Sequence, residues 1–210
     1  MDAQDPYRDA MATTSPLVLF RELIDNTVAD LQRVAYVEEW LGPRRRLPVF
    51  DVQVLREYGA KSVNRDRLAS LLASYARIAS GSIWERSRGR WRRRRYSELN
   101  PLDLAELGAF SRLGDLSLFL SGVFPEHVAG HPLEPRHLAR LSRLLDSNPG
   151  ELARAEEPFW LWEWVGKAAY GRAGESGLAR DFRTARRLLN VLTGRYLFPI
   201  RERWFGGPLG

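Results

Sequence analysis

The chain contains no cysteine. Disulfide bonds, thiolate metal sites, iron–sulfur clusters and a cysteine nucleophile are therefore all excluded. It also lacks any apolar run of the roughly 18 residues that a membrane-spanning helix needs. Lysine is nearly absent, since Lys61 and Lys167 are the only lysines among 32 basic residues. This preference for arginine carries no functional meaning by itself, but the positions of the arginines do.

What is present fits a globular domain. The 210 residues are 44% hydrophobic and 28% charged, the balance of a soluble single domain. Acidic residues outnumber Arg8 near the N-terminus, and no apolar segment precedes a cleavage site, so we expect no targeting signal and a cytoplasmic location. We expect residues 1–14 to be a disordered tail, with Met11 as an alternative start, and residues 201–210 to be a C-terminal tail.

Helical periodicity dominates the segment 15–200. Ser15 and Pro16 are a typical helix start, and apolar residues then recur every three or four positions up to Gly42 and Pro43. Between Pro43 and Pro48, the arginines at 44–46 should form an exposed connector. Further helices are expected at 51–58, 64–81, 100–113, 133–146, 150–170 and 177–197. The apolar run 116–124 is expected to lie buried at the centre, or to form an interface if the chain cannot cover it. The sequence thus predicts an all-α fold, a single-domain bundle of six to seven helices, with a basic arm at 82–96.

This arm is the strongest local feature. Its seven arginines face a single acidic residue, Glu85, so the arm carries +6, equal to the formal net charge of the whole chain. A turn signal at 87–89 favours a β-hairpin or extended arm, with a helix from Trp91 onward as the alternative. The residues expected to contact an anionic partner are Arg86, Arg88, Arg90, Trp91, Arg92, Arg93, Arg94, Arg95 and Tyr96.

Three partners for the arm remain open. Guanidinium groups pair with phosphate and aromatic rings stack on bases, which favours nucleic acid. An acidic protein surface would satisfy the same charges. The third alternative is internal, because the expected first helix carries acidic residues with which the arm could pair: Glu22, Asp25, Asp30, Glu38 and Glu39.

The last expected helix offers a second basic face. Arg180, Arg183 and Arg187 follow one another at steps of three and four, with Arg186 beside them. Such a stripe is most often the solvated side of an amphipathic helix. It would contribute to binding a polyanion if it lay on the same side of the bundle as the arm.

Aromatic residues concentrate in the helix expected at 150–170. Trp160 and Trp164 share one apolar face and Trp162 lies at its edge, a pattern typical of core packing. The alternative is an interface or pocket, to which Phe119 and Phe124 of the apolar run 116–124 would contribute. Because these two faces offer more apolar surface than a small bundle easily covers, we expect a homodimer.

Signatures of chemistry are weak. His127, His131 and His137 lie close together, but Pro125, Gly130 and Pro132 should prevent a helix that would align them, so we expect no metal site. No glycine-rich phosphate loop or nucleophile motif occurs, and no cofactor is implied. The sequence favours a non-catalytic helical interaction protein whose arm engages nucleic acid or an acidic protein. The alternative is a small-molecule-binding protein or an enzyme with a pocket inside the bundle near Trp160–Trp164.

Overall fold

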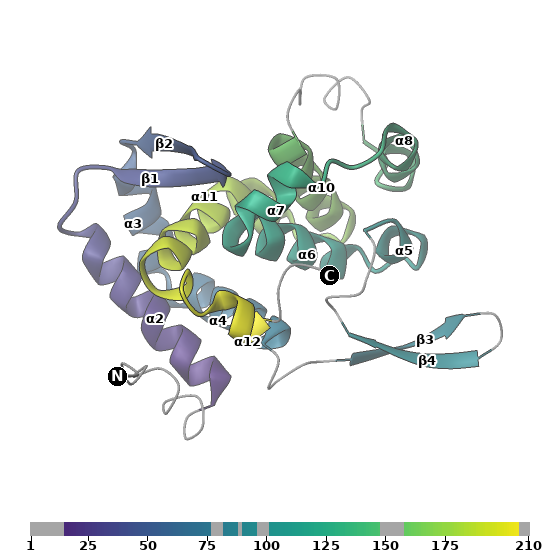
Figure 1. The fold of residues 1–210 in the computed structure, drawn as a ribbon, viewed down its shortest axis with the longest axis horizontal. Coiled ribbons are helices and arrows are strands. Elements are labelled where there is room, and N and C mark those ends of the chain that lie inside the picture. Colours follow the sequence, from purple (N-terminus) through teal and green to yellow (C-terminus); the bar gives the residue numbers. More distant parts are fainter. Residues whose placement is uncertain (1–14, 77–81, 88–89, 96–100, 148–157, 206–210) are drawn as a thin grey trace.

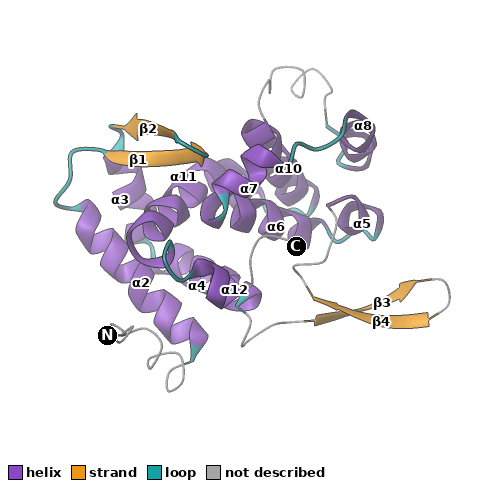
Figure 2. Ribbon diagram, in the orientation of Figure 1, coloured by secondary structure: helices purple, strands orange, loops and turns teal. Residues whose placement is uncertain are grey.

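The computed structural model describes residues 15–76, 82–87, 90–95, 101–147 and 158–205. The fold is all-α, as predicted: helices make up most of the described chain and surround one hydrophobic core (Figure 1). Two separate two-stranded antiparallel hairpins accompany the helices in Figure 2. The tail predicted at residues 1–14 lies outside the described residues. None of the described helices is long and apolar enough to cross a membrane.

The first helix, α2 (Pro16–Leu31), begins at the predicted Ser15–Pro16 position but ends nine residues earlier than the stripe up to Trp40 suggested. The chain instead forms β1 (Val37–Gly42), paired antiparallel with β2 (Arg45–Val49). Residues of β1 alternate between buried and more exposed positions up to Trp40, with Val37 and Glu39 buried. A period of two, with Val37 and Glu39 on the buried side, therefore replaces the helical period that Val34 and Val37 suggested.

A tight turn joins these strands and corrects the predicted connector at 44–46. Arg44 adopts a left-handed conformation (φ 60°), and Gly42 has φ 148°. A Cβ on Gly42 would lie 2.7 Å from the Cβ of Ala129, so glycine also permits the hairpin to approach the neighbouring helix. The predicted exposure of Arg44, Arg45 and Arg46 is confirmed.

Two helices follow the hairpin. The segment predicted at 51–58 is confirmed as α3 (Val52–Ala60), and that predicted at 64–81 begins two residues earlier as α4 (Ser62–Tyr75). Both pack against α2. Leu68, Leu71 and Leu72 of α4 are buried, as their helical spacing requires.

The centre of the molecule is α6 (Phe110–Val123), in which every residue from Leu113 to Val123 is buried. It lies against α10 (Pro158–Arg172) and α11 (Ser176–Leu192), which Figure 1 shows beside it. This confirms the central position predicted for the apolar run. The helix predicted at 100–113 is divided, because Gly108 (φ 69°) separates α5 (Pro101–Glu106) from α6.

Three short elements complete the core. The proline and glycine residues expected to prevent a helix after Phe124 instead border α7 (Pro125–Gly130), since Pro125 occupies a first-turn position that needs no N–H donor. The helix α8 (Pro135–Leu144) agrees with the predicted 133–146. The helix predicted at 177–197 is confirmed as α11 followed by a π-helical turn, η3 (Thr193–Leu197).

The C-terminal tail predicted at 201–210 is shorter than expected. Residues 201–205 form α12 (Arg201–Phe205), in which Trp204 and Phe205 are buried. Their rings contact Phe20 of α2 at centroid distances of 5.6 and 5.7 Å, and Phe205 also lies 5.1 Å from Phe119. Burial of two large aromatic rings makes α12 part of the core.

Candidate functional site

The basic arm forms a β-hairpin, the first of the two structures that the sequence left open. Strand β3 (Ser82–Ser87) pairs antiparallel with β4 (Arg90–Arg95). Figure 1 shows this ribbon extending away from the helical body, on the side opposite the β1–β2 hairpin. Arg88 and Tyr96, two of the predicted contact residues, lie outside the described residues.

The backbone register of the ribbon sorts its residues onto two faces. Trp84 pairs with Arg93, Arg86 pairs with Trp91, and Ser82 pairs with Arg95. Cross-strand partners share a face and successive residues alternate, so these six positions belong to one face. The opposite face carries Ile83, Glu85, Ser87, Arg90, Arg92 and Arg94. The register thus places both tryptophan positions with three arginines.

The predicted second basic face is largely taken up by internal ion pairs. Arg183 bonds to Glu163 of α10, with Nε to Oε1 at 2.8 Å, and Arg187 bonds to Glu39 of β1, with Nε to Oε2 at 3.1 Å. Arg180 is exposed and pairs with its neighbour Asp181. Of the three predicted arginines, Arg180 and Arg183 are exposed, whereas Arg187 is partly buried against β1.

Arg186, which the sequence placed beside this stripe, is completely buried. Its Nη2 bonds to Glu39, and its Nε lies 3.1 Å from Oε2 of Glu163. The guanidinium also lies 4.6 Å from the ring centre of Phe159. We call Glu39, Glu163 and Arg186, which join β1, α10 and α11, the buried ion cluster. The Nη1 atom of Arg186 has no hydrogen-bond partner among the described residues.

Nearby positive charges outweigh burial in setting the pKa of Glu163 in this cluster. Burial opposes the charge on Glu163, but the positive charges of Arg186, Lys167 and Arg183 hold its pKa below the ordinary value. Lys167 contributes directly, with Nζ 2.8 Å from Oε1 of Glu163. The carboxylate is thus charged at neutral pH in spite of its position.

The aromatic helix α10 is core, in agreement with the simpler interpretation of its sequence. Trp162 is buried, and Trp160 and Trp164 are half-buried and packed against the core. Phe119 and Phe124 are buried as well, stacked and edge-on with other rings of the same chain. Since the chain itself covers these faces, the reason for expecting a homodimer through them is lost.

A second buried polar group connects α4, α6 and α10. Asp115 accepts hydrogen bonds from Nη2 of Arg67 at 2.5 Å and from the hydroxyl of Tyr170 at 2.7 Å. Burial raises the pKa of Asp115, and Arg67 and Tyr170 offset this only in part. These contacts hold three helices together and leave the carboxylate covered, so we assign this group a structural role.

The histidines form no chelating group. His127 and His131 stack with ring centroids 4.1 Å apart, and His127 has a lowered pKa because it is partly buried and because His131 lies beside it. Among the residues that the structure describes, no three histidine or carboxylate side chains are placed to hold a metal ion. His137 lies on α8, apart from this pair in the chain.

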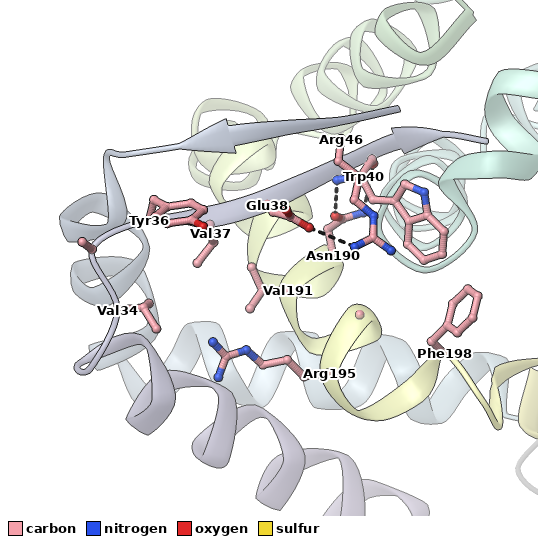
Figure 3. Close-up of a pocket in the computed structure, with 12 residues that line it drawn as sticks. Val34, Tyr36, Val37, Glu38, Trp40, Arg46, Asn190, Val191, Arg195 and Phe198 are labelled. Atoms are coloured by element: carbon pink, nitrogen blue, oxygen red, sulfur yellow. Dashed lines mark hydrogen bonds and ion pairs between the residues drawn. The ribbon is translucent and has the colours of Figure 1, made fainter. Parts of the chain in front are cut away.

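A cavity of about 510 Å³ lies between β1 and the end of α11, a region that the sequence did not single out (Figure 3). Trp40, Phe198 and Tyr36 contribute aromatic rings, and Arg46 lies 5.1 Å from the ring centre of Trp40. The twelve lining residues come from the segment before β1, from the hairpin and from α11 through Phe198. The three tryptophans of α10 are not among them. The cavity is therefore distinct from the pocket that the sequence alternative placed near α10.

Comparison with protein-family models, with curated proteins and with solved structures gave no match for this chain.

Proposed function

We propose that this protein binds nucleic acid through the β3–β4 ribbon, with a preference for single strands. The observation that carries the proposal is the register of the ribbon, in which Trp84 and Trp91 share a face with Arg86, Arg93 and Arg95. Single-strand binding combines cationic groups along the phosphates with aromatic rings on which bases stack. An acidic protein surface would use the charges but would not require tryptophans among them.

The charge balance supports a role outside the protein itself. The arginines of α11 meet buried carboxylates, as Arg186 meets Glu39 and Glu163. The ribbon sequence offers only Glu85 against seven arginines. Four consecutive arginines are also costly to bury without partners, at several kcal/mol for each ion. This excess of arginine in the ribbon sequence favours a polyanion as its partner.

Salt dependence provides the test. If the ribbon contacts about four to six phosphates, the logarithm of the association constant should fall with the logarithm of salt concentration with a slope of about −3 to −5. Replacing the four arginines at 92–95 with alanine should reduce that slope by about 3, since each phosphate contact contributes about 0.7–0.9. Fluorescence anisotropy with a labelled oligothymidine and a matched duplex measures both values.

A matched control removes the same charge from the helical body. The exposed arginines Arg136, Arg140, Arg143 and Arg180 are replaced together with alanine. This variant should retain most of the affinity and slope.

Trp91→Ala should weaken single-strand binding by about 1–3 kcal/mol while changing duplex binding little. Equal losses in the two quadruple variants, or no binding of either oligonucleotide at 50 mM salt, would refute the proposal and point to an acidic protein partner.

A further inference from the structure

The cavity between β1 and α11 has an unusual polar contact on its wall. The side-chain amide of Asn190 accepts a hydrogen bond from the backbone N–H of Trp40 at 2.6 Å and donates one to the carbonyl of Trp40 at 3.2 Å. The amide of Asn190, a planar group with a donor beside an acceptor, thus bonds to the backbone at the edge of β1. Figure 3 shows Asn190 below the strand, within the cavity lining.

The register predicts a second position of the same kind. In an antiparallel pair, residues bonded to the partner strand alternate with residues whose backbone groups point away from it. Trp40 lies opposite Arg46 and bonds to Asn190, so its groups point away from β2. The backbone N–H and C=O of Glu38, two residues earlier, therefore also point away from β2. It lies opposite Pro48, which has no N–H to donate.

The backbone N–H and C=O of Glu38 consequently lie on the edge of β1 that borders the cavity. Both Glu38 and Asn190 line it. One such position is enough for a planar heterocycle that carries a donor beside an acceptor. An added peptide strand would need several successive positions, and Asn190 already occupies the next one.

The remaining walls fit a heterocycle with an anionic substituent. Tyr36 and Phe198 are half exposed, so their rings can contact a planar ligand. Arg195 lies on the wall opposite β1 in Figure 3, with Nη1 2.6 Å from Oδ2 of Asp30. A guanidinium has five N–H donors, so this ion pair leaves Arg195 able to bond to an anion as well.

We propose that this cavity binds a nucleoside monophosphate, whose base pairs with the backbone of Glu38 and whose phosphate bonds to Arg195. The volume of about 510 Å³ is within the range of about 300–1,000 Å³ found for small-molecule sites. The site is independent of the β3–β4 ribbon, which lies on the other side of the body in Figure 1. Nucleotide binding in this cavity can therefore be tested independently of nucleic-acid binding by the ribbon.

Gly194 provides a variant that fills the cavity without disturbing the packing. It lines the cavity, and a Cβ added there meets no atom within 4 Å. Gly194→Leu should place its side chain in the space that the ligand needs. Gly171→Leu on α10 is the matched control, because a Cβ on Gly171 also meets open space but lies outside the lining.

The experiment titrates AMP, GMP, CMP and UMP into the full chain by calorimetry, with tryptophan fluorescence as a second signal from Trp40. We expect at least one of the four to bind with a Kd below about 1 mM. Gly194→Leu should weaken that nucleotide by about tenfold or more, and Gly171→Leu should leave it unchanged. Arg195→Gln should weaken the nucleotide but not its nucleoside, which lacks the phosphate.

A ribbon variant separates this site from the arm. Replacing arginines 92–95 with alanine should leave nucleotide binding intact, whereas loss of binding in that variant would assign the nucleotide to the ribbon and overturn the proposal. Absence of binding by all four nucleotides would overturn it too. So would equal affinity in Gly194→Leu and wild type, provided that thermal unfolding shows the variant to be folded.

Discussion

Arg186→Met tests the energetic role of the buried ion cluster. The substituted side chain retains much of the volume but removes the charge that joins Glu39 of β1 to Glu163 of α10. Breaking a buried pair by removing one partner costs about 3–5 kcal/mol. Here both carboxylates lose their buried partner and keep only the more exposed Lys167, Arg183 and Arg187. Total stability of a domain is about 5–15 kcal/mol, so this loss is a large fraction of it. With a urea m-value of about 2 kcal/mol/M, the unfolding midpoint should fall by about 1.5–2.5 M.

Two controls make the result decisive. Arg180→Met removes an arginine from the same helix whose side chain is 76% exposed, and it should leave the unfolding midpoint nearly unchanged. A triple variant, Glu39→Leu with Glu163→Leu and Arg186→Met, removes both carboxylates together with the charge between them. It should recover part of the loss, since a buried ion pair is often neutral relative to apolar residues. If Arg186→Met is as stable as Arg180→Met, the reasoning is refuted.

Two further predictions follow from the same core. Because the folded pKa of Glu163 lies below its ordinary 4.5, its contribution to stability is present above about pH 4.5 and is lost as pH falls through the folded pKa. Urea unfolding between pH 3 and 7 should show this decline in wild type and a smaller one in Glu163→Gln, and parallel curves would contradict it. In α10, Gly166→Ala would overlap the ring of Phe182 and should lower the melting temperature, whereas Gly171→Ala meets open space and should stabilise by about 0.5–1 kcal/mol. Melting temperatures shifted equally for both would show that Phe182 moves aside freely.

Local signals predicted those elements whose periodicity has one explanation. The run 116–124 is apolar on nearly all sides, which favours a buried position, and α6 is indeed central. Ser15 and Pro16 fix the start of α2 because proline needs no N–H donor in the first turn. The strand β1 was missed because Val34 and Val37, three positions apart, extend the helical stripe of the preceding segment. The deciding contact, between Trp40 and Asn190, joins residues 150 positions apart.

The candidate sites likewise differ in whether local sequence signals or distant contacts determine them. The hairpin at 82–96 was predictable from its turn signal and its bordering residues. The cavity was not, because its walls come from β1 and from the end of α11, whose proximity depends on the whole fold. Even so, one signal was present in the sequence: Trp40, Tyr36 and Phe50 lie within a short segment, and an aromatic cluster of this kind is typical of binding surfaces.

Arginine spacing alone could not separate the two basic segments. Arg183 and Arg187 belonged to the predicted stripe and Arg186 was expected beside it, yet all three bond to Glu39 or Glu163. Burial of Arg186 depends on Glu39, which is 147 positions away in the chain. The fold places two acidic residues, Glu39 and Glu163, against the basic face of α11. The ribbon β3–β4 extends from the body and its sequence contains a single acidic residue, Glu85, which is why we propose an anion from outside the chain as its partner.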